Sequence, residues 1–340
     1  MKRDISILFV CIFAIFAIYI ATDFLSPLPF GNKSMEIEIP RGSTFRQAVD
    51  ILAEEKLVRD KKLFLLLGRI NGMDRKIKAG YYSIQGPVNP LSIFGMLKKG
   101  QIIEYEITIV EGDSLKEIGE KLSEKNIITM EDFGKLSSDR EFLFSHEIRA
   151  PTFEGYLFPD TYKIPKGMDP KEAIDLMIAR MREKYSGDLR ARTAEIGFSE
   201  RETLTLASII EKEAVTDMER PLVSAVYHNR LRKGIPLQAD PTSIYGIKSA
   251  GEKITDRDVR RRTPYNTYII KGLPPGPIAS PGIKSIHAAL YPAEVPYMFF
   301  VSNNDGTHRF SVTPAEHQIA VEIYRKKKNE ESRTRVNGNS

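Results

Sequence analysis

The sequence predicts an α+β protein with an N-terminal transmembrane helix, a module built on a repeated strand–turn–helix unit, and a larger mixed α/β domain after it. Three observations predict this architecture. Residues 5–21 form an uncharged apolar run, and the chain resembles itself at an offset of 70 residues. Two strong helical patterns then precede a long segment rich in Pro, Gly, Tyr and Asn. With 340 residues, 41% of them hydrophobic, the chain can fill more than one domain core.

The apolar run predicts a membrane anchor over residues 5–22, behind a short cytoplasmic N-terminus of residues 1–4. Its length lies at the short end of the roughly 17–25 residues that span a bilayer as a helix. Lys2 and Arg3 precede the run and Asp23 follows it, so the positive-inside rule places the N-terminus in the cytoplasm. The rest of the chain is then expected outside the cytoplasmic (inner) membrane, in a periplasmic or extracytoplasmic position. The alternative is a cleaved signal peptide, but the run is long for one and no small-x-small site follows it.

Residues 23–34, which contain several turn-forming residues, are predicted to be a linker. Residues 35–105 are assigned to the first module, residues 106–325 to the larger domain, and residues 326–340 to a disordered tail that follows a basic run.

The internal repeat aligns residues 37–66 with residues 107–136. Each copy predicts a short strand, a Gly turn, an amphipathic helix capped by Ser43 or Asp113, and a second short helix. A later strand in each copy precedes a helix that begins with Pro90 or Pro170. The repeat indicates duplicated architecture and by itself implies no ligand.

The larger domain contains two predicted helices, over residues 201–215 and 221–231. Residues 234–281 have little predicted regular structure. Because such long segments in a compact domain are usually functional, we expect a binding cleft there.

Glu213 is the candidate proton-transfer residue, and Glu211 is the alternative. Residues two apart on a helix point about 200° away from each other, so the two carboxylates cannot face one pocket. Glu213 continues the apolar stripe of Leu206, Ile209 and Ile210, whereas Glu211 follows a more polar side. Desolvation at the end of an apolar stripe raises the pKa of a carboxyl group, which favours Glu213 as a general acid. The alternative interpretation is a solvated carboxylate in the last turn of the helix.

Polar and aromatic side chains cluster in three further segments, residues 154–162, 238–245 and 264–268. This composition is suited to stacking on sugar rings and binding their hydroxyl groups. Individually these residues also fit ordinary turns, caps and core positions. The candidate substrate-binding residues are Glu154, Tyr156, Asp160, Gln238, Asp240, Thr242, Tyr265 and Asn266.

Five segments together resemble the endolytic murein transglycosylases of the MltG (YceG-like) family. They are LASIIEKEA (206–214), NRL (229–231), LQADPT (237–242), YNTY (265–268) and GLPPGPI (272–278). The resemblance covers roughly residues 35–325. It implies a LysM-like, peptidoglycan-binding module over residues 35–105, a transglycosylase catalytic domain over residues 106–325, and a catalytic glutamate within Glu211-Lys212-Glu213.

The resemblance further implies lytic cleavage of the β-1,4 bond between MurNAc and GlcNAc, which leaves a 1,6-anhydro-MurNAc end and terminates growing strands. One acid/base carboxyl group suffices for that reaction, whereas ordinary glycosidases use a pair. Three alternatives stay open: a non-catalytic peptidoglycan-binding scaffold of the wall-synthesis machinery, a hydrolase that uses water and, more remotely, a cytosolic small-molecule lyase.

Charge and motif content limit the classes of ligand and partner that we expect. Fifty basic residues are interspersed with 45 acidic ones for a net charge of +5, which is not the dense basic stripe of a nucleic-acid-binding protein. The five histidines show no zinc-ligand spacing, and the one cysteine, Cys11, lies in the anchor. We therefore expect no metal, no cofactor and no nucleic acid. The expected partners are peptidoglycan glycan strands, the membrane and, from the family, penicillin-binding proteins.

Overall fold

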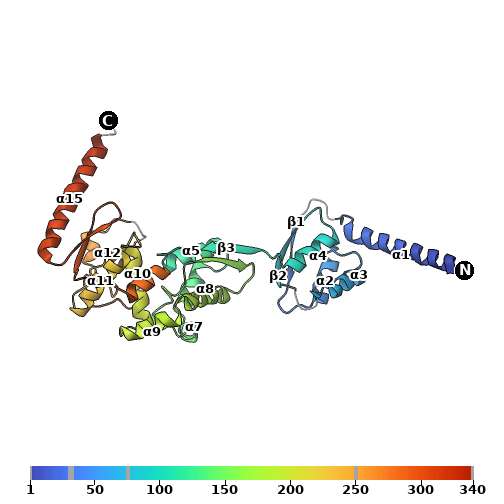
Figure 1. The fold of residues 1–340 in the computed structure, drawn as a ribbon, viewed down its shortest axis with the longest axis horizontal. Helices are drawn as coiled ribbons and strands as arrows, with labels where there is room; N and C mark the ends of the chain where they lie inside the picture. The colour runs from blue at the N-terminus through green and yellow to red at the C-terminus, as the bar shows by residue number, and fades with distance from the viewer. Residues whose placement is uncertain (1, 30–33, 74–76, 249–251, 338–340) are drawn as a thin grey trace. The chain divides into compact units, whose positions relative to one another are not determined.

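The computed structural model describes residues 2–29, 34–73, 77–248 and 252–337 (Figure 1). The chain divides into two compact units. The first comprises residues 1–106 with 163–168, and the second comprises residues 107–162 with 169–340. Residues 163–168, which the sequence places in the larger domain, belong to the first unit because Lys166 donates its backbone N–H to the Ile103 carbonyl, 2.9 Å away, and pairs with Glu36.

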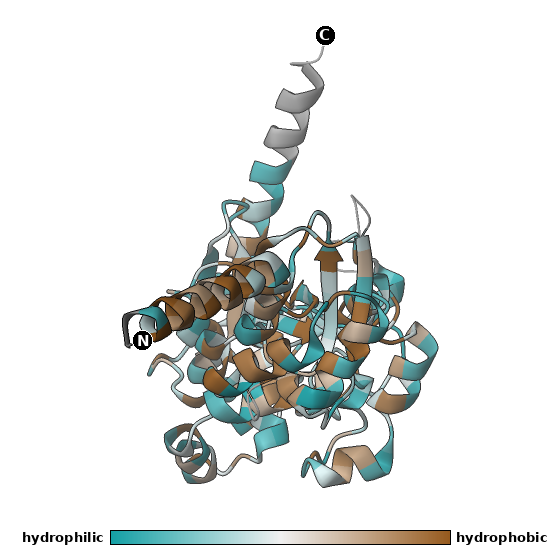
Figure 2. Cartoon of the chain, turned by 90° about the vertical axis from the view of Figure 1, so that its right-hand side faces the viewer, coloured by the Kyte–Doolittle hydropathy of each residue, from teal (hydrophilic) through white to brown (hydrophobic). Residues whose placement is uncertain are grey.

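Helix α1 (Lys2–Leu25) confirms the predicted N-terminal apolar helix. Its segment Asp4–Leu25 has a mean hydropathy of 2.7 and is the one helix, among the described residues, long and apolar enough to cross a membrane. Figure 2 shows this helix as a continuous apolar rod. A signal sequence would have the same composition, so the helix alone does not distinguish an anchor from a signal.

The described part of the predicted linker, residues 23–29, packs against the first unit. Phe24 and Leu28 are buried in the core of the first unit, together with Phe64 and Val88. The turn residues between 26 and 29 allow the chain to bend, but the two apolar side chains pack against the core. Residues 30–33 lie outside the described residues.

The first unit has the order β1 (Ser34–Ile39), α2 (Phe45–Glu54), α3 (Lys61–Ile70), β2 (Gly80–Gln85) and α4 (Pro90–Lys99). Strands β1 and β2 pair antiparallel, with Ile37 opposite Tyr82. The aromatic rings of Phe45, Phe64 and Phe94 meet at the centre of the helices, with centroids 5.6–6.4 Å apart.

The second copy follows the same order: β3 (Glu104–Thr108), α5 (Leu115–Glu124), α6 (Met130–Ser137), α7 (Arg140–Ser145), β4 (Thr161–Pro165) and α8 (Pro170–Lys184). Strands β3 and β4 form a two-stranded sheet. Helix α7 and the segment leading to β4 are the additions relative to the first copy. The predicted strand–turn–helix repeat is therefore visible in the order of the elements, and both Pro-led helices begin where the sequence predicts.

Both predicted helix caps lie one residue later than expected. Thr44 caps α2 and Ser114 caps α5, each in a capping box with Gln47 or Glu117 three residues on. A capping box needs Glu or Gln at that spacing, which Thr44 and Ser114 have. Asp113 instead accepts a hydrogen bond from the Val110 N–H at 2.8 Å and pairs with Lys121.

The remainder of the second unit is mostly helical and surrounds α10. Its elements are α9 (Gly187–Glu195), α10 (Glu200–Glu213), α11 (Arg220–Arg232), α12 (Asp240–Ile244), α13 (Asp256–Val259), α14 (Ile283–Leu290), β5 (Phe299–Ser302), β6 (His308–Ser311) and α15 (Pro314–Asn337). Helix α10 packs against α9, α11, α12 and α14. Between α11 and α14 the described residues contain only the short helices α12 and α13, as the Pro- and Gly-rich composition predicts.

Helix α15 corrects the predicted disordered tail. The backbone is helical through Asn337 and so covers most of residues 326–340. Lys, Arg and Glu are strong helix formers, and residues of opposite charge four apart support a helix without any apolar core. Residues 338–340 lie outside the described residues.

Candidate active site

Helix α10 carries both candidate acids. Ser199 caps its first turn in a capping box with Glu202, and residues 203–210 are all buried. The helix ends at Glu213 because Ala214 adopts an extended backbone, with φ −83° and ψ 117°. The sequence interpretation of a polar side at Ala207 and Ser208 is wrong. Both residues are buried, because neighbouring helices cover α10 on that side too.

Both carboxylate oxygens of Glu211 bind groups on neighbouring helices. Its side chain is 5% exposed, and its Oε1 lies 2.9 Å from Nη1 of Arg220 on α11. Its Oε2 accepts a hydrogen bond of 2.9 Å from the backbone N–H of Gly282, the N-cap of α14. Arg220 also donates to the Ser285 hydroxyl. Both oxygens of Glu211 therefore have fixed partners on neighbouring helices.

Glu213 has a different environment at the C-terminal end of the same helix. The residue as a whole is partly exposed, and its Oε1 accepts a hydrogen bond from the Tyr227 hydroxyl at 3.3 Å. Burial, together with the nearby carboxylate of Asp240, raises the pKa of Glu213 to about 8, although hydrogen bonds from Tyr227 and the Asp240 backbone act in the opposite direction. The negative end of the α10 dipole acts in the same direction as burial. Glu213 therefore holds its proton at neutral pH and can donate it.

Asp240, the first residue of α12, lies close to Glu213, and Gln238 lies in the loop just before α12. Asp240 is exposed, and its Oδ1 accepts a hydrogen bond of 2.5 Å from the Tyr268 hydroxyl. Gln238 is also exposed and has a φ of +51°, a conformation that side chains rarely adopt. Arg230 stabilises it by donating from Nη1 to the Gln238 Oε1, 3.1 Å away.

Glu154 forms a second buried acidic position. It is 2% exposed and accepts hydrogen bonds from the Leu115 N–H at 3.1 Å and the Tyr245 hydroxyl at 2.8 Å. Burial raises the pKa of Glu154 to about 7, although these hydrogen bonds oppose the shift. The Tyr245 ring lies against that of Tyr265, with centroids 4.6 Å apart.

A cavity of about 500 Å³ opens beside Glu154. It is lined by the start of α5, by the segment around Tyr245 that follows α12, and by Lys212, the neighbour of Glu213. Helix α12 thus extends from Asp240, beside Glu213, to the edge of this cavity. Its volume falls in the range of ordinary ligand sites, roughly 300–1,000 Å³.

Of the other predicted binding residues, three are buried and Asp160 is partly exposed. Tyr156 and Thr242 are buried, and Asn266 is 0% exposed. The Asn266 amide donates to the carbonyls of Asp258, Val259 and Arg261, the last at 2.7 Å. Asp160 is engaged with Arg180, whose Nε lies 2.7 Å from its Oδ2, and backbone and guanidinium hydrogen bonds lower the pKa of Asp160. The structure therefore brings Asp240 close to Glu213, and Tyr265 close to Glu154. Sugar contact by the remaining residues stays a prediction.

Sequence reasoning missed two partners on α11. Tyr227 is the hydrogen-bond donor to Glu213, and Arg220 is the ion-pair partner of Glu211. Both lie in a helix of ordinary composition, and only their three-dimensional position reveals them. The spacing of the α11 sequence gives no signal for either.

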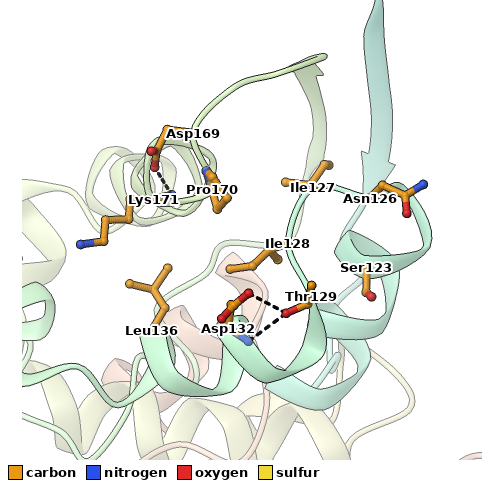
Figure 3. Close-up of a pocket in the computed structure, with 10 residues that line it drawn as sticks. All are labelled: Ser123, Asn126, Ile127, Ile128, Thr129, Asp132, Leu136, Asp169, Pro170 and Lys171. Carbon is orange, nitrogen blue, oxygen red and sulfur yellow. Dashed lines mark hydrogen bonds between the residues drawn. The ribbon is translucent and has the colours of Figure 1, made fainter.

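A second cavity of about 500 Å³ lies between α6 and the start of α8 (Figure 3). Figure 3 shows Pro170 and Lys171 facing Ile128 and Leu136 across it. Thr129 and Asp132 on its lower wall are hydrogen-bonded to each other. None of the predicted site residues lines this cavity.

Comparison with known proteins places the chain in a family. The profile of the YceG-like family matches residues 37–323, which include both candidate acids and every predicted binding residue. The chain belongs to the YceG-like family.

Two relatives of the YceG-like chain carry a functional name. An endolytic murein transglycosylase of Bacillus subtilis is 31% identical over 326 residues, covering 90% of this chain and 89% of the relative. An endolytic murein transglycosylase of Streptococcus pneumoniae is 27% identical over 316 residues, covering 83% of this chain. This chain spans 56% of the length of the streptococcal protein.

A solved structure shows the same fold. The crystal structure of a YceG-like protein from Listeria monocytogenes superposes with a TM-score of 0.59 at 30% identity. The match covers 84% of this chain and 98% of the Listeria chain.

Proposed function

We propose that this chain is a membrane-anchored endolytic murein transglycosylase that cuts the β-1,4 bond between MurNAc and GlcNAc within glycan strands. The observation that carries the proposal is the environment of Glu213, a carboxyl group at the end of α10 beside Asp240, whose pKa is raised to about 8 in a chain of the YceG-like family. The names of the relatives from Bacillus and Streptococcus support the same reaction class.

In the proposed reaction, protonated Glu213 donates its proton to the glycosidic oxygen as the bond from that oxygen to C1 of MurNAc breaks. The C6 hydroxyl of the same MurNAc attacks C1 and forms the 1,6-anhydro ring. The proton of that hydroxyl passes to the Glu213 carboxylate, so the acid is restored within one turnover. A single carboxyl group serves as acid and then as base.

The groups around Glu213 have supporting roles in this proposal. The carboxylate of Asp240, held by Tyr268, faces the position where positive charge develops on the sugar ring, which stabilises the transition state. The Tyr227 hydroxyl fixes the orientation of the Glu213 carboxyl group. Glu154, Tyr265 and the cavity beside them are proposed to hold a neighbouring sugar of the strand.

The first unit is proposed to be a LysM-like module that binds peptidoglycan, which its order β1-α2-α3-β2 supports. Helix α1 is proposed to be an uncleaved anchor in the cytoplasmic membrane with the N-terminus inside. At that surface the enzyme meets strands as they are polymerised and terminates them beside penicillin-binding proteins. That last partner stays a prediction.

The decisive comparison is between Glu213→Gln and Glu202→Gln in the full-length protein, assayed on purified glycan strands. Because general acid catalysis contributes roughly 10²–10⁴-fold, Glu213→Gln should lose at least a hundredfold of strand cleavage while strands still bind. Glu202→Gln alters a carboxylate of the same helix but keeps its capping box, so it should leave cleavage unchanged.

Equal cleavage by the wild type and the Glu213→Gln variant would contradict the proposal. Binding of strands without cleavage by the wild type would favour the scaffold alternative.

A further inference from the structure

Gln238 has a backbone conformation that its place in the fold does not require. Its φ of +51° lies in the left-handed region, which few residues other than Gly and Asn adopt. Lys56, Asn126 and Glu147 also have a positive φ, but each directly follows the C-cap of a helix, where a left-handed residue is common. Gln238 instead lies two residues before a helix. Backbone strain of this kind in a side-chain-bearing residue is typical of functional sites.

Hydrogen bonds on both sides of Gln238 hold this conformation. The Gln238 N–H donates to the Thr267 carbonyl at 3.0 Å, and the Ala239 N–H donates to the Thr267 hydroxyl at 2.9 Å. Leu237 and Ala239 are buried, whereas Gln238 is exposed. The fold therefore fixes Gln238 in an exposed position between two buried residues.

Arg230 of α11 holds the Gln238 side chain as well as the loop. Arg230 is 7% exposed, and its Nε donates to the Met298 carbonyl at 2.7 Å. Its Nη1 donates to the carbonyls of Pro236 at 3.2 Å and Leu237 at 2.9 Å. The same Nη1 donates to Oε1 of Gln238 at 3.1 Å. Because a buried guanidinium group is costly unless its donors are bound, these contacts are firmly held.

The contact with Arg230 determines which atom of the Gln238 amide is left for another partner. A guanidinium group only donates hydrogen bonds, so the amide must turn its acceptor, Oε1, to Arg230. The Nε2 group, which carries two donor hydrogens, makes no hydrogen bond within the part of the chain that the structure describes. Gln238 therefore presents an oriented hydrogen-bond donor at the surface.

This donor belongs to the segment that lies beside the proposed acid. Gln238 is two residues before Asp240, so their Cα atoms are at most about 7 Å apart. The carboxylate and the backbone of Asp240 both lie close enough to Glu213 to shift the pKa of its carboxyl group. Helix α12, which begins at Asp240, packs against α10 (Figure 1). One short segment thus carries a group beside the acid and, two residues earlier, the oriented donor.

A glycan strand contains few groups that only accept hydrogen bonds. Its hydroxyl groups both donate and accept, whereas the carbonyl oxygens of its N-acetyl groups only accept. MurNAc and GlcNAc carry the N-acetyl group on C2, next to the C1 atom at which the proposed reaction breaks the bond. A donor held near Glu213 therefore matches the acetyl carbonyl of a sugar at the cut bond.

We propose that Gln238 recognises an N-acetyl group of the strand, with its Nε2 donating to the acetyl carbonyl, and that Arg230 is the positioning residue that holds Gln238 for this contact. The inference rests on the proposed function and deepens it, because it names the sugar group that the site recognises. An N-acetylated sugar beside Glu213 is then cut efficiently, and de-N-acetylated stretches of the strand are cut slowly.

The test compares glycan strands with the same strands after enzymatic de-N-acetylation, each cleaved by the full-length protein at a mildly acidic pH. The measured quantity is the ratio of kcat/KM for the N-acetylated strands to kcat/KM for the de-N-acetylated strands. Because both values come from one preparation of enzyme, a loss of folded protein does not change the ratio.

Two variants of Gln238 should lower this ratio. Gln238→Gly accepts the positive φ without strain and removes the amide, so the ratio should fall roughly 3–10-fold below that of the wild type. Gln238→Glu keeps an oxygen for Arg230, but its carboxylate repels the acetyl carbonyl and attracts the amine of a de-N-acetylated sugar. The ratio should then fall more than about tenfold. Gln318→Glu, the same change at an exposed position of α15, should leave the ratio unchanged.

Arg230→Lys tests the positioning role. One ammonium group cannot bind Met298, Leu237 and Gln238 as the guanidinium group does, so the ratio should fall about as far as in Gln238→Gly. Adding Gln238→Gly to Arg230→Lys should cause no further fall. The control is Arg232→Lys at an exposed position of the same helix, which should keep the wild-type ratio.

Equal ratios in the wild type and both Gln238 variants, with the wild type active, would overturn the inference and leave the proposed enzyme intact. A wild-type ratio in Arg230→Lys would overturn the positioning role of Arg230. No cleavage of either strand by the wild type would instead overturn the proposed function.

Discussion

At the residue scale, the environment of each carboxyl group distinguishes the two glutamates of α10. Glu211 and Glu213 are two positions apart, but Glu211 is tied to Arg220 and Gly282, whereas Glu213 has one weak donor and a raised pKa. An acid needs a proton to give and an open side from which to give it. Glu213 keeps its proton at neutral pH and has no ion-pair partner among the described contacts, whereas the fixed partners of Glu211 make Glu211 a structural residue.

The raised pKa of Glu213 predicts a pH-dependent stability. The unfolded chain releases this proton near the ordinary value of 4.5, whereas the folded chain keeps it until about 8. The folded state therefore binds more protons in this window, and this contribution to the free energy of unfolding falls as pH rises from about 4.5 to 8.

Glu213→Gln removes that titration but keeps a side chain of nearly the same size. Urea unfolding of both proteins should show the variant gaining stability relative to the wild type steadily as pH rises from about 5 to 8, and the gain should level off above pH 8. A difference that does not change with pH would mean that Glu213 is ionised in the folded protein and cannot be the acid.

At the element scale, the Glu211–Arg220 pair connects α10 to α11 and, through Gly282 and Ser285, to α14. Arg220→Met leaves a buried carboxylate without its cation, which should cost about 3–5 kcal/mol in the free energy of unfolding. Adding Glu211→Gln removes the unpaired charge. The double variant should therefore be more stable than the sum of the single changes, by about 0.5–3 kcal/mol.

Denaturant titrations of the three variants and the wild type measure this coupling. Additive effects would show that the pair contributes nothing beyond its separate members.

A second element-scale prediction concerns two glycines inside helices of the first unit. A Cβ on Gly68 of α3 would lie 1.9 Å from Cε1 of the buried Phe45, so Gly68→Ala must displace α3 from α2. The expected cost is about 1–3 kcal/mol. Gly95 of α4 has no atom within 4 Å of its Cβ position, so Gly95→Ala should stabilise the protein by about 0.5–1 kcal/mol.

Thermal unfolding of the two alanine variants should therefore move the midpoint in opposite directions. Destabilisation of similar size in both would mean that helix propensity and packing do not act as described.

The elements also show what the sequence could predict. The apolar run, the two Pro-led helices and the extent of α10 follow from local composition and spacing, and they agree with the structure within a few residues. The docking of Phe24 and Leu28 could not be predicted, because a linker and a packed turn have the same local composition. The charged helix after residue 325 was missed because a basic run is typical of both a solvated helix and a disordered tail.

The candidate site was also predicted only in part, because the partners of a side chain in three dimensions are not visible in its local sequence. Helical spacing favoured Glu213 over Glu211, but the reason was incomplete, since α10 is buried on both sides. The partners Tyr227 and Arg220 come from another helix and leave no mark in the sequence around Glu213. The composition of the binding segments could not separate exposed Asp240 from buried Asn266.

At the scale of the whole molecule, the chain combines an apolar helix, a duplicated strand–helix unit and a helical domain that carries Glu213. The match to the YceG-like family over residues 37–323 covers both compact units. The proposed anchor and the proposed glycan-binding unit would together hold a strand near the membrane while Glu213 cuts it. In the proposed reaction the nucleophile is a hydroxyl group of the substrate and not water.

The most direct test of that claim is the mass of the strand ends that the full-length enzyme releases in water enriched in heavy oxygen. We predict MurNAc ends that are lighter by one water than hydrolysis products, that contain no heavy oxygen, and that are absent with Glu213→Gln. Ends that contain heavy oxygen, or equal release by the variant, would contradict the account.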